Sequence, residues 1–131
     1  MNLVIDTSVI LAVLTSEPER PSIVKLTQDA NLIAPASVHW EIGNALSAML
    51  KRKRLTLPEA QSAATSYAKI PIRFIEVSLK ESLAIASKHN LYAYDAYVIA
   101  CAQSERCNLI SLDAALLNAA TASGVGIVEV P

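Results

Sequence analysis

Four acidic side chains stand apart in this sequence because their surroundings are apolar. Asp6 directly follows the first apolar run of the chain, and Asp113 follows the apolar segment 109–112. Asp95 opens another apolar stretch, and Glu41 lies near the start of a helical pattern. Charge is costly in such surroundings unless it is paired, and carboxylates that converge raise one another's pKa unless cations neutralise them. Their convergence would create a site for a divalent cation.

The chemistry of such a site follows from its ligands. Oxygen ligands alone favour Mg²⁺ or Mn²⁺ over zinc or copper. A cation held in this way can lower the pKa of a bound water and stabilise charge on attacking and leaving oxygens, as phosphodiester hydrolysis requires. We therefore expect one metal site whose catalytic, metal-binding residues are Asp6, Glu41, Asp95 and Asp113.

Several of these acids also have a structural interpretation that stays open. An aspartate that begins a helix is often only an N-cap, and this applies to Asp95 and Asp113. Glu41 could instead pair with the basic run downstream of it. Glu76 ends another apolar run, but it lacks hydroxyl neighbours like those that follow Asp6, so we leave it out of the site. The other acids lie in polar surroundings and are expected at the surface.

The elements that position the four acids alternate between strands and helices. Short apolar runs predict strands at residues 2–5, 32–34, 72–77, 108–112 and 127–130. An apolar segment spans residues 7–14, and helices are expected at residues 20–29, from Ser37 to a basic run, and at 58–69, 79–89, 94–106 and 114–122. This alternation predicts a three-layer α/β/α domain around a mostly parallel sheet. Parallel strands share one carboxyl edge, where open α/β sheets bind ligands, and Asp6 and Asp113 are expected there.

One basic run and a few aromatic residues could contact a nucleic acid. The run ends the long helix and comprises Lys51, Arg52, Lys53 and Arg54. Two roles stay open for this run: it could contact phosphates of a nucleic acid, or it could simply be a solvated helix terminus. Trp40 and Tyr94 flank the acids and could stack on bases, although core packing is the favoured interpretation of Trp40, and Tyr94 stays open. His39 and His89 lack partner spacing and are expected at the surface or in packing.

Composition bounds the class of protein. The 131 residues suffice for one domain, which would span residues 1–131, and 53% of them are hydrophobic. No run approaches the roughly 18–20 apolar residues of a membrane span, and Asp6 interrupts the first apolar run where an export signal would continue. We therefore expect a cytoplasmic protein whose surplus apolar surface serves a partner or self-association. The net charge of −1 includes the four acids, so the rest of the chain is mildly basic.

Four motifs together resemble the PIN-domain ribonucleases, in particular the VapC-type toxins of bacterial and archaeal toxin–antitoxin pairs. Each motif alone is weak, but the four in this order cover nearly the whole chain. They are Val4-Ile5-Asp6-Thr7-Ser8, Trp40-Glu41-Ile42-Gly43-Asn44-Ala45-Leu46, Tyr94-Asp95-Ala96-Tyr97-Val98-Ile99-Ala100 and Leu109-Ile110-Ser111-Leu112-Asp113.

The resemblance implies a PIN-like fold and an endoribonuclease that hydrolyses single-stranded RNA with a metal-activated water, leaving a 5′-phosphate and a 3′-hydroxyl. The four acids would be its metal-binding quartet, with supporting roles for Ser8, Asn44 and Ser111. Ser111 stands where these toxins usually have threonine, and it keeps the hydroxyl. The resemblance also implies a homodimer and a cognate antitoxin protein that blocks the active site.

Other functions stay open beside this one. A phosphatase of the haloacid-dehalogenase type, with Asp6 as covalent nucleophile, would usually have a second aspartate at the position of Ser8. A PIN-fold module that binds RNA or protein without nuclease activity is not favoured, because all four acids are present. A nuclease that works without an antitoxin is also open. An RNA-cleavage assay separates an enzyme from a binding module.

Overall fold

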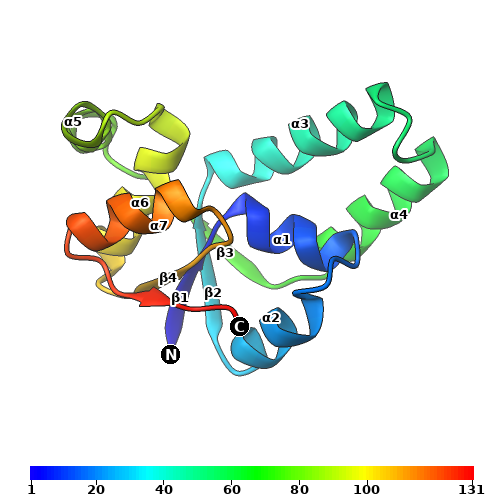
Figure 1. Cartoon of the computed structure of the whole chain (residues 1–131), viewed down its shortest axis with the longest axis horizontal. Helices are drawn as coiled ribbons and strands as arrows, with labels where there is room; N and C mark the ends of the chain where they lie inside the picture. The colour runs from blue at the N-terminus through cyan, green and yellow to red at the C-terminus, as the bar shows by residue number, and fades with distance from the viewer.

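The computed structural model describes residues 1–131 and arranges them around a single sheet (Figure 1). In chain order its elements are β1 (Asn2–Ile5), α1 (Thr7–Leu14), α2 (Arg20–Thr27), β2 (Asn31–Pro35), α3 (Ser37–Lys51), α4 (Leu57–Ala68), β3 (Ile72–Ile75), α5 (Leu79–His89), α6 (Ala93–Glu105), β4 (Asn108–Ile110), α7 (Ala114–Ala122) and β5 (Ile127–Val128). No helix combines the length and the apolar content that a membrane span requires.

The sheet has five strands in the order β3-β2-β1-β4-β5, and every pairing is parallel. In the centre, Val4 of β1 is in register with Ile33 of β2 and Leu109 of β4. The chain first builds the sheet outward on one side of β1 and then returns to add β4 and β5 on the other. The strand order therefore reverses at β1, and the crevice beyond its carboxyl end is where ligands bind in open α/β sheets.

Alternate side chains of the strands enter two separate cores, one on each face of the sheet. Leu3 and Ile5 contribute to a core with side chains of α1 to α4, whereas Val4 contributes to a core with side chains of α6 and α7. Figure 1 shows the same division, with α1 to α4 on one side of the strands and α5 to α7 on the other. The predicted three-layer α/β/α architecture is confirmed, and the sheet is entirely parallel.

Several strands end earlier than the sequence predicts. The strands expected at 72–77 and 108–112 stop at Ile75 and Ile110. Beyond Ile110 the backbone finds side-chain partners in place of the sheet: Leu112 N donates to Ser8 Oγ at 3.0 Å, and Asp113 N donates to Ser111 Oγ at 2.9 Å. Local polar side chains thus satisfy amides that the apolar pattern assigned to a strand.

Helices α3 and α4 form a long hairpin that extends away from the sheet (Figure 1). Val38, Ile42 and Leu46 lie one helical turn apart and bury one face of α3 in the core. Helix α4 begins with a capping box, in which the side chain of Thr56 caps Glu59 N and the Glu59 carboxylate accepts from Thr56 N. The start of α3 lies at the carboxyl edge of the sheet, and its end lies at the tip of the hairpin.

Candidate active site

Asp6 lies at the carboxyl end of β1 and is only 6% exposed. It is the N-cap of α1, because its Oδ1 accepts from Val9 N at 3.3 Å. The same oxygen accepts from Ser8 Oγ at 2.7 Å, and Oδ2 accepts from Ser111 Oγ at 2.6 Å. Burial raises the pKa of Asp6, the three hydrogen bonds lower it in part, and the charge of Asp113 raises it further.

The hydroxyls of Ser8 and Ser111 join the two loops that form the site. Each donates its proton to Asp6 and accepts a backbone N–H, from Leu112 and Asp113 respectively. The two hydroxyl oxygens are 3.4 Å apart, but neither has a second proton to donate to the other. Both serines therefore hold Asp6 in one orientation and bring the segment after β4 against the end of β1.

Asp113 is an exposed N-cap of α7, with Oδ1 accepting from Leu116 N at 3.1 Å. The N-cap interpretation of this residue is therefore correct as far as one oxygen is concerned. Its charge nevertheless raises the pKa of Asp6 and of Asp95. Asp113 thus caps a helix and also belongs to the electrostatic field of the site.

Asp95 lies in the first turn of α6, whose N-cap is Tyr92. The N-cap interpretation is therefore wrong for Asp95, and its carboxylate makes no capping hydrogen bond. Burial raises the pKa of Asp95, and the charges of Asp113 and Asp6 raise it further. A carboxylate with these neighbours and no structural partner is available to bind a cation.

Glu41 lies on α3 and has no cation beside it. Burial, then the charges of Asp6 and Asp95, raise its pKa to about 7. Its Oε1 is buried without a hydrogen-bond partner, and so is Thr7 Oγ1. The Thr7 hydroxyl faces Glu41 closely enough to lower its pKa slightly, yet the two groups do not reach hydrogen-bond geometry. The basic run begins ten residues further along the helix, about 15 Å away, so the suggested pairing with Glu41 is wrong.

These donors suit a hard divalent cation, although they do not close around one. No three histidine, cysteine, aspartate or glutamate side chains approach closely enough to hold a metal ion. Mutual repulsion of like charges favours that wider spacing. All four acids offer oxygen ligands, which Mg²⁺ and Mn²⁺ prefer. Glu41 Oε1 is buried without a hydrogen-bond partner, which costs free energy. A cation bound to this oxygen would remove that cost.

Several other residues named from the sequence form no hydrogen bond or ion pair with the four acids. Asn44 is exposed, and its side chain makes no hydrogen bond to them. Glu76 instead lines a neighbouring cavity of about 250 Å³ between the starts of α3 and α6, with Ser37 and Tyr97. The basic run lies exposed at the tip of the α3–α4 hairpin.

The aromatic residues near the acids are more exposed than expected. Trp40 is 74% exposed, so the expectation of core packing is wrong, and Tyr94 is exposed as well. His39 Nδ1 lies 3.0 Å from the hydroxyl of Tyr67, and His89 Nε2 lies 3.0 Å from Ser123 Oγ. Both histidines thus make hydrogen bonds outside the acidic site.

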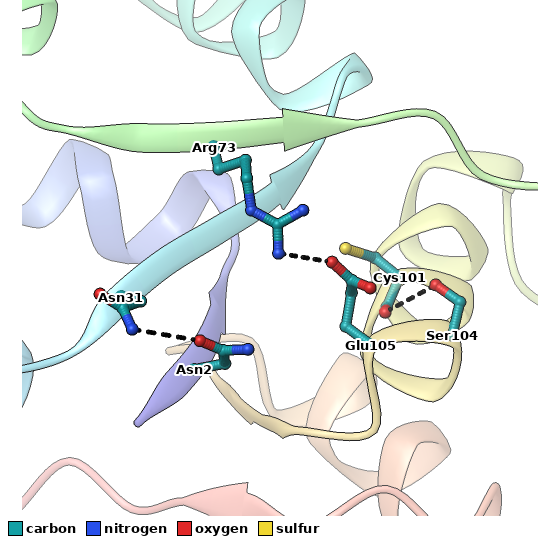
Figure 2. Close-up of polar contacts among 6 residues, drawn as sticks. All are labelled: Asn2, Asn31, Arg73, Cys101, Ser104 and Glu105. Carbon is teal, nitrogen blue, oxygen red and sulfur yellow. Dashed lines mark hydrogen bonds and ion pairs between the residues drawn. The ribbon is translucent and has the colours of Figure 1, made fainter.

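Charges at the opposite edge of the sheet are arranged differently. Arg73 of β3 and Glu105 at the end of α6 form the only ion pair of the molecule, with 2.7 Å between Nη2 and Oε1. Nearby, Asn31 Nδ2 donates to Asn2 Oδ1 at 3.3 Å, and Ser104 Oγ donates to the Cys101 carbonyl at 3.1 Å (Figure 2). The polar groups drawn there have partners of their own.

Comparison with known proteins places this arrangement in a family. The model of the family described as PIN domain matches residues 3–122. A comparison with curated proteins found no match.

Three solved structures have similar folds. PAE2754 from Pyrobaculum aerophilum is 20% identical with a TM-score of 0.73, covering 97% of this chain and 83% of its own. VapBC2 from Rickettsia felis, bound to a promoter DNA fragment, is 13% identical with a TM-score of 0.68 and 98% of both chains covered. VapC20 from Mycobacterium tuberculosis, a sarcin–ricin loop cleaving toxin, is 15% identical with a TM-score of 0.65, covering 94% of this chain and 95% of its own.

Proposed function

This chain belongs to the PIN domain family, and from that premise we propose that it is an endoribonuclease that hydrolyses single-stranded RNA with Mg²⁺ or Mn²⁺. The observation that carries the proposal is the group of carboxylates beyond β1. Three of them have raised pKa values, in each case partly through the charge of another acid of the group, and Glu41 Oε1 is buried with no partner. Such an arrangement is unstable by itself and becomes favourable around a divalent cation.

The residues that would hold the cation are Asp6, Glu41, Asp95 and Asp113. When bound, Mg²⁺ or Mn²⁺ supplies a charge that activates water and stabilises the oxygens of a phosphodiester under attack. Asp6 is the most firmly oriented ligand because Ser8, Ser111 and Val9 N hold both of its oxygens. Asp113 offers the oxygen that its helix cap leaves free.

Ser8 and Ser111 are positioning residues in this proposal. Their protons lower the pKa of Asp6 and so oppose the effect of burial, because hydrogen bonds to a carboxylate favour its ionised form. An ionised Asp6 is required for metal binding. Ser111 also fixes the backbone of Asp113, so one hydroxyl contacts two members of the acidic group.

The decisive experiment is cleavage of a single-stranded RNA by the purified protein with Mg²⁺ or Mn²⁺. EDTA and Asp6→Asn serve as controls: EDTA is expected to abolish cleavage, and Asp6→Asn to reduce it by about 100-fold or more. Cleavage at the wild-type rate in either control would overturn the metal mechanism. Metal-dependent RNA binding without any cleavage would instead support the alternative of a binding module.

We further propose that the chain is the toxin of a toxin–antitoxin pair and acts as a homodimer with a cognate antitoxin. Support comes from the fold shared with toxin–antitoxin proteins, including a complex from Klebsiella pneumoniae. Exposed apolar side chains that a protein partner could cover include Leu79 and Leu83, which lie one turn apart on α5. Expression of the wild type should arrest growth of a bacterial host, and expression of Asp6→Asn should not.

A further inference from the structure

One face of α3 is exposed along its whole length and begins beside the acidic site. Its residues are spaced four, three and four positions apart, so they lie in a single stripe opposite the buried face of the helix. At 1.5 Å per residue the stripe is about 16 Å long. We call it the α3 stripe, and it comprises Trp40, Asn44, Ser47 and Lys51, all of them exposed.

Trp40, at the start of the α3 stripe, is an exposed aromatic side chain that directly precedes Glu41 in the sequence. Its indole is 74% exposed, although tryptophan usually buries most of its surface. Its ring meets the ring of His39 edge-on, with centroids 4.8 Å apart. His39 is itself held by the Tyr67 hydroxyl at 3.0 Å and contacts Phe74 edge-on at 5.9 Å. Trp40 is thus supported from one side and remains open to a stacking partner.

The other end of the α3 stripe is strongly basic and has no local counter-charge. Lys51 continues into Arg52, Lys53 and Arg54, and all four are exposed. None of them forms an ion pair, since the only one in the molecule joins Arg73 and Glu105. The acid nearest along the chain, Glu59, is engaged in the capping box of α4. Four free cations in a row match the charge of a phosphate backbone.

We propose that the α3 stripe is the track along which the RNA strand enters the active site, an inference that rests on the proposed ribonuclease function. Trp40 stacks on a base next to the phosphate held at the acids. Lys51 to Arg54 contact phosphates further along the strand. With a stacked rise of about 3.4 Å per nucleotide, the 16 Å of the stripe correspond to about five nucleotides. The strand is attracted at the tip of the hairpin, where the protein is positive, and reacts where the acids gather.

The test is equilibrium binding of fluorescent single-stranded RNA in the presence of EDTA. Because EDTA prevents metal-dependent cleavage, the measured Kd reports RNA binding by the α3 stripe without the metal site. Trp40→Ala should weaken binding of a 12-nucleotide strand about 5-fold or more, the scale of removing one base–aromatic stack. Changing Lys51, Arg52, Lys53 and Arg54 together to Gln should reduce the slope of log Kd against log salt by about 0.7 for each phosphate that the protein no longer neutralises. A four-nucleotide strand bound at Trp40 should not respond to the basic substitutions, because it cannot reach them.

Matched controls separate the track from general exposure and charge. Tyr92→Ala removes an aromatic side chain that is 89% exposed, and Lys80→Gln with Lys88→Gln removes two cations from α5; both should leave RNA binding unchanged. Thermal unfolding checks that each variant is folded.

Unchanged Kd and salt slope in the stripe variants, alongside RNA cleavage by the wild type, would overturn the track while the ribonuclease function stands. Loss of a dimer in sedimentation for Trp40→Ala, without a change in Kd, would likewise overturn it and assign the stripe to a second copy of the chain. Failure of the wild type to cleave RNA with any metal would instead contradict the proposed function itself.

Discussion

Charged side chains are paired at the amino edge of the sheet and unpaired at its carboxyl edge. At the amino edge, Arg73 and Glu105 meet at 2.7 Å and the polar groups around them are partnered (Figure 2). At the carboxyl edge, Asp6, Glu41 and Asp95 face like charges and no cation. Helix α6 joins the two regions, with Asp95 in its first turn and Glu105 as its last residue. Charge is thus paired at the amino edge and unpaired at the carboxyl edge, where the proposed cation would bind.

This difference has an energetic consequence. An exposed ion pair contributes about 0–1 kcal/mol to stability, so the amino edge gains little from Arg73 and Glu105. Carboxylates whose pKa is raised on folding destabilise the folded protein at neutral pH. The carboxyl edge therefore costs stability in the absence of a cation, a common property of active sites.

The largest expected effect comes from removing the central acid of the carboxyl edge. Asp6→Asn should reduce metal-dependent RNA cleavage by about 100-fold or more, the scale of losing one catalytic group. The thermal unfolding temperature without metal should change little, because the change removes a buried charge and keeps an oxygen for Val9 N and Ser8, which offsets the loss of the acceptor for Ser111 Oγ. Rates and melting curves measured on the same preparations check both parts. A variant that loses activity by unfolding would not support the comparison.

Metal addition should stabilise the carboxyl edge specifically. At about 100 times its Kd, a ligand of the folded state contributes about 2.7 kcal/mol to the free energy of unfolding. We expect Mn²⁺ to raise the unfolding temperature of the wild type and of Glu105→Gln, and to have little effect on Asp95→Asn. An equal increase in all three proteins would place metal binding elsewhere.

The pH dependence of stability should show the same repulsion. The pKa of Glu41 rises on folding from 4.5 to about 7, so the folded state holds a proton that the unfolded state has lost in this range. The contribution of Glu41 to stability therefore falls as pH rises from about 4.5 to about 7, by on the order of 1–2 kcal/mol for a partly buried group that solvent still screens.

Comparison with Glu41→Gln isolates this contribution together with the coupling of Glu41 to Asp6 and Asp95, because the carboxylates outside the site titrate equally in both proteins. In chemical unfolding without metal, the free energy of unfolding of the variant should increase relative to that of the wild type between pH 4.5 and pH 7. Above pH 7 the difference should stay constant. A constant difference between the two proteins from pH 4.5 to pH 7 would contradict the raised pKa.

The smallest effect is expected at the amino edge. Glu105→Gln should lower the free energy of unfolding by no more than about 1 kcal/mol and leave RNA cleavage unchanged, since the ion pair lies at the far end of α6 from Asp95. Denaturant titration and the cleavage rate measure the two quantities. Loss of cleavage in this variant would show that the edges are coupled through α6.

Local pattern determined the alternation of strands and helices and the position of acids just beyond apolar runs. Those features depend on hydrophobic periodicity and on the free-energy cost of a charge next to a buried strand. Both can be read from residues that are close together in the sequence. The expected helices at 79–89 and 114–122 agree with α5 and α7 residue for residue. Asp6, the acid that follows the first strand, lies where the strand order reverses.

Tertiary structure alone decided which groups meet. The hydrogen bond from Ser111 to Asp6 joins residues 105 positions apart, and the exposure of Trp40 depends on how α3 packs against β3 and α4. No local pattern encodes the hydrogen bond, because it depends on the order in which strands are placed beside one another. The spacing of Trp40 from Val38 and Ile42, by contrast, already places it on the opposite face of α3. The four acids were visible in the sequence, but their mutual repulsion, the unpaired oxygen of Glu41 and the single face of α3 that leads away from them emerge only when distant segments share one edge of the sheet.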